Sequence, residues 1–226
     1  MVKKNNQTSS IGLITLTNPT SPVAEQYRTV RTNLQFSSTF HQQLKTLVVT
    51  SAGPAEGKST TAANLAVVFA NAGSKVLLVD ADMRKPTIYK IFKLNNMSGL
   101  STLLSSEQSL DAVVQSTELS HLCVLTSGPK PPNPSELLHS DRMTQIIEAA
   151  RNQYDFIIFD MPPVIAVTDA QIIASKVDGT LLVVREKITK KESLLKAHQL
   201  LNLVGAKMVG AVYNGMQEAH DQGYYY

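Results

Sequence analysis

The fold of this chain is decided by residues 47–66, which read LVVTSAGPAEGKSTTAANLA. The first four residues form an apolar run that is typical of a buried strand, and residues 60–66 are an alanine-rich stretch that favours a helix. Between them lies the glycine-containing loop 52–59. A strand, such a loop and a helix in this order present backbone N–H groups at a helix N-terminus, so they predict an anion site of phosphate size.

The side chains of this loop suit the triphosphate of a nucleotide. Gly57 lets the backbone come close to phosphate, Lys58 can reach the β- and γ-phosphates, and the Ser59 hydroxyl can ligate Mg²⁺. The alternative is an ordinary strand–helix turn that contains Gly-Lys-Ser by chance, and the flanking strand and helix argue against it. We expect nucleotide contacts from Gly53, Pro54, Ala55, Glu56, Gly57, Lys58, Ser59 and Thr60.

Two further apolar runs end in aspartate. Residues 76–79 are followed by Asp80 and Asp82, and residues 156–159 are followed by Asp160. In an open parallel sheet, ligands lie beyond the carboxyl ends of the strands, so these acids should meet the loop there. We expect Asp160 to serve Mg²⁺ directly or through water, and Asp80 and Asp82 to divide metal-water orientation and proton acceptance between them. The alternative is that one of these acids caps the following helix.

Composition bounds the class of protein. A chain of 226 residues with 43% hydrophobic content is consistent with one α/β domain, and a net charge of +3 is too small to argue for nucleic acid as a partner. The single cysteine, Cys123, allows no disulfide within the chain, which fits a reducing cytosol. No apolar run approaches the roughly 18 residues of a membrane span, and the N-terminus does not resemble a signal peptide. We expect a cytoplasmic protein that reaches the membrane only through a partner.

The order of elements indicates a doubly wound α/β domain, with a mostly parallel sheet flanked by helices. Ser21-Pro22 predicts a helix start, with the helix running to about Phe36. The other expected helices are 59–72, 99–106, 109–115, 135–152, 168–176 and 190–204. The expected strands are 46–51, 75–80, 121–126, 155–160, 179–185 and 207–213. We call the phosphate-binding loop 52–59 the P-loop. We divide the chain into an extended arm (1–21), the P-loop domain (22–213) and a flexible tail (214–226).

Several segments together resemble a known family. They are 25–31 (EQYRTVR), 56–60 (EGKST), 78–84 (LVDADMR), 131–138 (PPNPSELL), 160–163 (DMPP) and the terminal 224–226 (YYY). In this order they resemble the bacterial tyrosine kinases of capsular and exopolysaccharide biosynthesis, in the split form in which a cytoplasmic kinase works with a separate membrane protein.

The resemblance implies roles for the matched residues. Lys58 and Ser59 would hold ATP and Mg²⁺, Asp80 would be the base toward the tyrosine hydroxyl, and Asp82 and Asp160 would organise the metal. In related P-loop ATPases an asparagine at the position of Asn214 contacts adenine, although a turn before Gly215 explains it equally well. The implied autophosphorylation sites are Tyr224, Tyr225 and Tyr226.

The resemblance also implies partners. They are a transmembrane modulator protein, a cognate protein-tyrosine phosphatase, tyrosine-containing protein substrates and other copies of this chain in a ring. The ring would be mediated by Glu25, Arg28 and Arg31, whereas their spacing alone favours a solvated helix face with one intrahelical ion pair.

Two departures from the family pattern bear on function. The chain has Ala55 where the family usually has glycine, which would weaken nucleotide binding if that position requires a positive φ. The tail carries three consecutive tyrosines, whereas the family usually has a longer cluster of spaced tyrosines. The competing hypotheses are an ATPase switch of the MinD/ParA type, which shares the architecture but has a lysine where this chain has Gly53, and a nucleotide-gated scaffold for a membrane polysaccharide co-polymerase.

Overall fold

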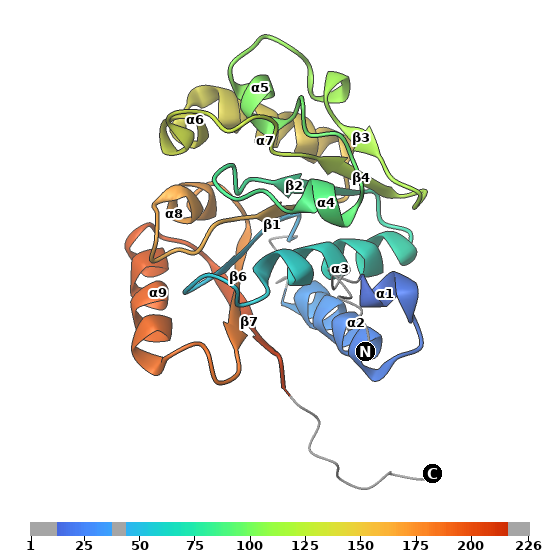
Figure 1. Ribbon diagram of the computed structural model, residues 1–226, viewed down its shortest axis with the longest axis vertical. Coiled ribbons are helices and arrows are strands. Elements are labelled where there is room, and N and C mark those ends of the chain that lie inside the picture. The colour runs from blue at the N-terminus through green and yellow to red at the C-terminus, as the bar shows by residue number, and fades with distance from the viewer. Residues whose placement is uncertain (1–12, 38–43, 217–226) are drawn as a thin grey trace, which may run out of the picture.

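The computed structural model describes residues 13–37 and 44–216. Its centre is a sheet in the order β3-β4-β2-β5-β1-β6-β7 (Figure 1). Neighbouring strands are parallel, except that β3 is antiparallel to β4. The strands are β1 Thr46–Ser51, β2 Val76–Asp80, β3 Gln115–Ser116, β4 Leu122–Leu125, β5 Phe156–Asp160, β6 Gly179–Arg185 and β7 Met208–Asn214.

Helices cover both faces of this sheet (Figure 1). One face carries α1 Ile14–Thr17, α2 Pro22–Phe36, α3 Lys58–Asn71 and α4 Ile88–Ile91. The other carries α5 Leu100–Leu104, α6 Pro134–His139, α7 Asp141–Gln153, α8 Asp169–Ala174 and α9 Lys191–Leu203. Every residue of β1, β2 and β5 is buried, because these strands lie between two helical layers. The predicted doubly wound, mostly parallel fold is confirmed.

The start of α2 shows why its bounds could be predicted. The Ser21 hydroxyl accepts a hydrogen bond from the Ala24 N–H, and Pro22 occupies the first helical turn, where its missing N–H costs nothing. The helix ends at Phe36, as predicted.

Two predicted helices are wrong. The segment 109–115 holds only a single 3₁₀ turn, Leu110–Ala112, after which the chain enters the short edge strand β3. The segment 135–152 is divided between α6 and α7 by Ser140, whose backbone is extended. The Ser140 hydroxyl accepts from the Met143 N–H, so this residue caps the second helix instead of continuing the first.

The expected extended arm is also corrected where the structure describes it. Ile14–Thr17 form the short helix α1, which packs on α3. Thr15 is buried, and both its N–H and its hydroxyl donate to Asn64 Oδ1 on α3. Buried polar groups need such partners, so this contact fixes a segment that looks irregular in the sequence.

Candidate active site

The P-loop and the acidic residues meet at one edge of the sheet. The loop connects β1 to α3, and β5 lies between β1 and β2, so three adjacent strands carry these groups. Val49 and Asp80 are both register partners of Asp160. The predicted convergence at the carboxyl edge is confirmed, because right-handed crossovers return parallel strands to the same edge.

The loop backbone depends on two residues with positive φ. Gly57 has φ 97°, and a Cβ there would lie 2.0 Å from Asn214 Nδ2. Ala55 has φ 61°, a region that glycine reaches without cost and alanine reaches with strain. Position 55 therefore has the positive φ at which, as stated above, alanine in place of glycine would weaken nucleotide binding. The buried Glu56 carboxylate accepts from the Ala52 N–H at 3.1 Å and so ties the loop to the end of β1.

Lys58 lies among the carboxylates. Its Nζ is 2.9 Å from Asp82 Oδ2, 3.6 Å from Asp160 Oδ1 and 3.2 Å from Ser59 Oγ. Burial lowers the pKa of Lys58, but the carboxylates of Asp160 and Asp82 outweigh burial, so the net pKa is raised above its ordinary value. Lys58 stays charged and holds the acids together.

Asp160 is fully buried at the end of β5, and neither of its carboxylate oxygens accepts a hydrogen bond from the described residues. Burial raises its pKa, and the nearby Lys58 ammonium opposes that rise. The Lys58 ammonium lies 3.6 Å from this carboxylate, beyond hydrogen-bond distance, so Asp160 keeps its oxygens open to a metal or to metal-bound water, and the Ser59 hydroxyl lies at the start of the adjacent α3.

The oxygens of Asp160 and Ser59 fit Mg²⁺, which usually takes one or two protein oxygens as ligands and fills its other positions with phosphate and water. Within 13–37 and 44–216, no three His, Cys, Asp or Glu side chains are grouped to hold a metal by themselves.

Asp80 has one engaged oxygen and one open oxygen. Its Oδ2 accepts from the N–H groups of Thr87 and Ile88, each at 3.0 Å, and so holds the start of α4. Its Oδ1 is buried without a partner among the described residues. Burial, followed by the charge of Asp160, raises the pKa of Asp80 to about 8. The capping alternative therefore holds for one oxygen, while the other can still take up a proton.

Asp82 and Arg84 anchor the loop that follows β2. Asp82 Oδ1 accepts from the Lys85 N–H at 3.0 Å, a local turn contact beside its pair with Lys58. Arg84 makes a bidentate pair with Asp169 of α8, at 2.9 and 3.0 Å, and also donates to Ser135 Oγ. From the sequence, Arg84 could contact phosphate, contact a nearby acid or be a solvated surface residue, and in the structure it contacts the acid.

The helix face at 25–31 is divided between two kinds of contact. Arg28 pairs with Glu25 within α2 and also donates to the Pro19 carbonyl. Arg31 donates to the Val68 carbonyl near the end of α3, at 3.0 Å. The intrahelical pair expected from spacing is present, and Arg31 also joins two helices of the same chain.

Two strand ends reach the P-loop from outside. Asn214, the last residue of β7, donates from Nδ2 to the Glu56 carbonyl at 3.1 Å. Arg185, the last residue of β6, donates from Nη1 to the Ala55 carbonyl at 2.8 Å. The contacts of Arg185, Asp169 and Ser135 were not predicted from the sequence. A signal for Arg185 exists, since it ends an apolar strand at the edge where the P-loop lies.

Tyr224, Tyr225 and Tyr226 lie outside the described residues. Among the helices of the described ranges, none has the length and apolar character to cross a membrane.

Comparison with known proteins identifies the relatives of this site. A family model described as an AAA domain matches residues 45–205. The tyrosine-protein kinase YwqD of Bacillus subtilis (strain 168) is 49% identical over 215 residues, which cover 94% of this chain and 90% of that protein.

Solved structures are also similar to this chain. The chimerical protein CapA2B2 superimposes with a TM-score of 0.87 at 43% identity, covering 91% of this chain and 90% of that one. The kinase domain of the Escherichia coli tyrosine kinase ETK superimposes with a TM-score of 0.88 at 34% identity, covering 100% and 88%. The cell division ATPase MinD of Pyrococcus furiosus, at 24% identity and a TM-score of 0.64, shares the fold.

Proposed function

Because this chain belongs to the bacterial tyrosine-protein kinases, we propose that it transfers the γ-phosphoryl group of ATP to tyrosine hydroxyls, including those of its own tail. The observation that carries the proposal is that Lys58, the metal-compatible oxygens of Ser59 and Asp160, and the open carboxylate oxygen of Asp80 lie at one edge of the sheet. Phosphoryl transfer depends mainly on positioning and on charge stabilisation, which these groups supply.

Nucleotide and metal would be held by the loop and its neighbours. The N–H groups of residues 53–60 and the Lys58 ammonium would bind the phosphates, with Asn214 beside the loop. Ser59 would ligate Mg²⁺ directly, while Asp160 and Asp82 would hold its water ligands. When bound, Mg²⁺ would neutralise charge that develops on the transferring phosphate. Lys58, which pairs with Asp82 and Asp160 in the described structure, would then be shared with the phosphates.

Asp80 is the group we assign to the tyrosine proton. A base works best when its pKa lies near the working pH, and the pKa of Asp80 is raised to about 8. Its Oδ2 is fixed by the amides of Thr87 and Ile88, so Oδ1 is the atom that would receive the proton.

The substrates and partners follow from the tail and the helix face. Residues 215–226 could extend roughly 40 Å, at ~3.3 Å per residue, which is enough to enter the site of a neighbouring subunit. Glu25 and Arg28 would contribute to a homo-oligomeric ring, with Arg31 supporting their helix from α3. A transmembrane modulator would recruit the chain to the inner face of the membrane to regulate polysaccharide synthesis and export, and a phosphatase would reverse the modification.

A mixture of two complementary variants, one without a working active site and one without tail tyrosines, tests this proposal. One chain carries Lys58→Met and an intact tail, and the other carries phenylalanine at positions 224–226 and an intact site. With Mg·ATP, phosphotyrosine should form on the first chain only, as detected by mass spectrometry of the C-terminal peptides. ADP release without phosphotyrosine in the mixture and in the wild type would refute the kinase and favour the ATPase switch.

A further inference from the structure

Arg185 and Asn214 contact the backbone carbonyls of the P-loop from the ends of strands β6 and β7. The two residues are register partners at the ends of β6 and β7. Arg185 donates to the carbonyl of Ala55, and Asn214 donates to the carbonyl of Glu56. Two successive peptide groups of the loop are therefore held by side chains from other strands.

The direction of these bonds determines where the loop amides point. The peptide bonds of the loop are trans, so each carbonyl points away from the N–H of the following residue. Holding the Ala55 and Glu56 carbonyls outward turns the N–H groups of Glu56 and Gly57 the other way. Those N–H groups belong to the set that a P-loop directs at phosphate.

Ala55 is the residue that makes such support necessary. Its φ of 61° is strained for alanine, so the peptide group after it is prone to rotate toward an unstrained conformation. Arg185 opposes that rotation with a charge-assisted bond. Its own backbone is fixed as well, because its N–H donates to Thr189 Oγ1 and its carbonyl accepts from the Thr189 N–H.

Gly57 provides independent evidence that Asn214 is fitted to the loop. A Cβ at position 57 would lie 2.0 Å from Asn214 Nδ2, so the amide occupies the space that a side chain there would take. A residue with a side chain at position 57 would therefore displace Asn214 from the Glu56 carbonyl.

We propose that Arg185 and Asn214 are positioning residues of the nucleotide site, which fix two P-loop peptide groups so that their N–H groups face the phosphates. The inference rests on nucleotide binding at this loop, which is part of the function proposed above. It does not depend on tyrosine being the phosphate acceptor.

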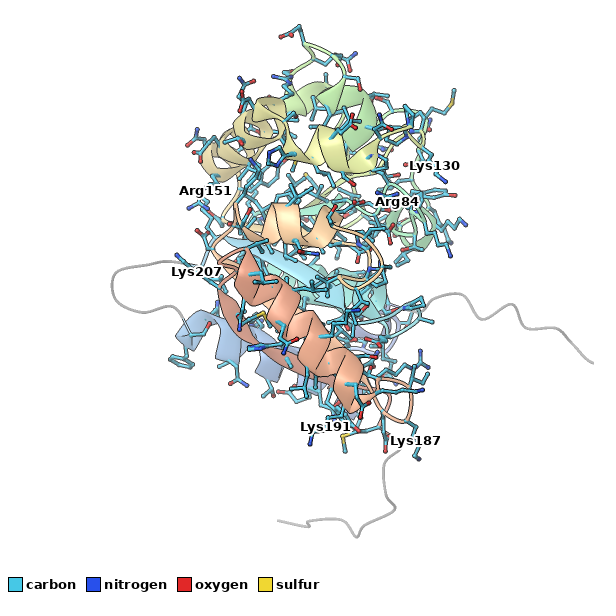
Figure 2. The ribbon with its side chains drawn as sticks, turned by 90° about the vertical axis from the view of Figure 1, so that its left-hand side faces the viewer. Arg84, Lys130, Arg151, Lys187, Lys191 and Lys207 are labelled. Carbon is cyan, nitrogen blue, oxygen red and sulfur yellow. The ribbon has the colours of Figure 1, made fainter. Side chains whose placement is uncertain are left out.

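The test measures binding of Mg·ADP by calorimetry to the full chain. Arg185→Met should raise the Kd by up to about tenfold, because the loop of the free protein would then hold its amides toward phosphate for only part of the time. Arg185→Lys should recover part of that loss, because an ammonium can still donate to the carbonyl. The matched control is Lys191→Met, which removes one positive charge from the exposed start of α9 (Figure 2) and should leave the Kd unchanged.

Repeating the Arg185→Met substitution in an Ala55→Gly chain distinguishes positioning of the loop from simple attraction between the Arg185 charge and the phosphates. In an Ala55→Gly chain the positive φ costs little, so Arg185→Met should raise the Kd by a smaller factor than it does beside Ala55. An equal factor in both backgrounds, or an equal loss in Lys191→Met, would overturn the role of Arg185.

Asn214 is tested with a ligand that has no base. Asn214→Leu keeps roughly the size of the side chain and removes its N–H donors without adding a charge, so it should weaken binding of Mg·pyrophosphate as well as of Mg·ADP. Unchanged pyrophosphate binding would overturn its positioning role and favour an adenine contact. If the wild type binds Mg·ADP but forms no phosphotyrosine, the kinase proposal fails while these binding ratios still decide the inference.

Discussion

Replacing Lys58 with methionine should destabilise the nucleotide-free protein as well as inactivate it. Lys58 is 12% exposed and is the cation that lies between Asp82 and Asp160. At an effective dielectric constant of about 20, unit charges 3.6 Å apart attract by about 4–5 kcal/mol. Part of this attraction offsets the desolvation of Lys58 itself. We therefore expect a net loss of about 3 kcal/mol at pH 8.

This loss should depend on pH, because the substitution removes a charge that lowers the pKa of Asp160. In the mutant, the folded-state pKa of Asp160 rises further above its unfolded value near 4. A group whose pKa is higher in the folded state than in the unfolded state stabilises the protein at pH values below its unfolded-state pKa. This contribution is lost as the pH rises through its folded-state pKa. The deficit of the mutant should thus be about 1–2 kcal/mol smaller at pH 6 than at pH 8.

Urea unfolding followed by circular dichroism, in EDTA and without nucleotide, measures both effects. Lys191→Met is the control, since it removes an exposed lysine from α9. If Lys58→Met and the wild type have the same free energy of unfolding at pH 6 and pH 8, Lys58 does not neutralise the buried acids, and this reasoning is refuted.

Three further predictions concern other groups. Asp160→Asn should raise the Mg²⁺ concentration needed for ATP-analogue binding, whereas Asp80→Asn should slow transfer by orders of magnitude and leave the Mg²⁺ titration unchanged; coincident titrations would contradict the assignment. Burial raises the pKa of Asp178, but the hydrogen bonds that it accepts from Arg151, Thr46 and the Lys45 backbone together outweigh burial and lower the pKa below its ordinary value. Asp178→Asn should therefore cost about 2 kcal/mol at pH 7, a loss that disappears as the pH falls below about 4, and a constant difference in urea unfolding across that range would count against it. Arg28→Ala should reduce the assembly mass by light scattering and change stability little, because its contacts with Glu25 and the Pro19 carbonyl are exposed to solvent, while Arg31→Ala should lower stability more because it breaks the partly buried bond to Val68; equal stability of the two variants would argue against that distinction.

The sequence predicted the features that depend on local pattern. Continuous apolar runs located β1, β2 and β5, and the loop motif with its flanking elements located Lys58 and Ser59. The convergence of Asp80, Asp82 and Asp160 followed from one rule about the carboxyl edge of parallel sheets.

The features that the sequence analysis missed depend on tertiary neighbours. That Asp80 holds the start of α4, and that Arg84 pairs with Asp169, require knowing which segments fold back onto the strand ends. Arg185 could be placed at the edge, but not against the Ala55 carbonyl. The break at Ser140 was not predicted, because the apolar period continues on both sides of it.

The most direct test of the kinase assignment is the position of phosphate on the protein after incubation with Mg·ATP. Mass spectrometry of the C-terminal peptide should find phosphate on one or more of Tyr224, Tyr225 and Tyr226 in the wild type, with and without the cytoplasmic fragment of a membrane partner, and none in Lys58→Met. An unmodified tail in the wild type under both conditions, with ATP bound and hydrolysed, would contradict the assignment.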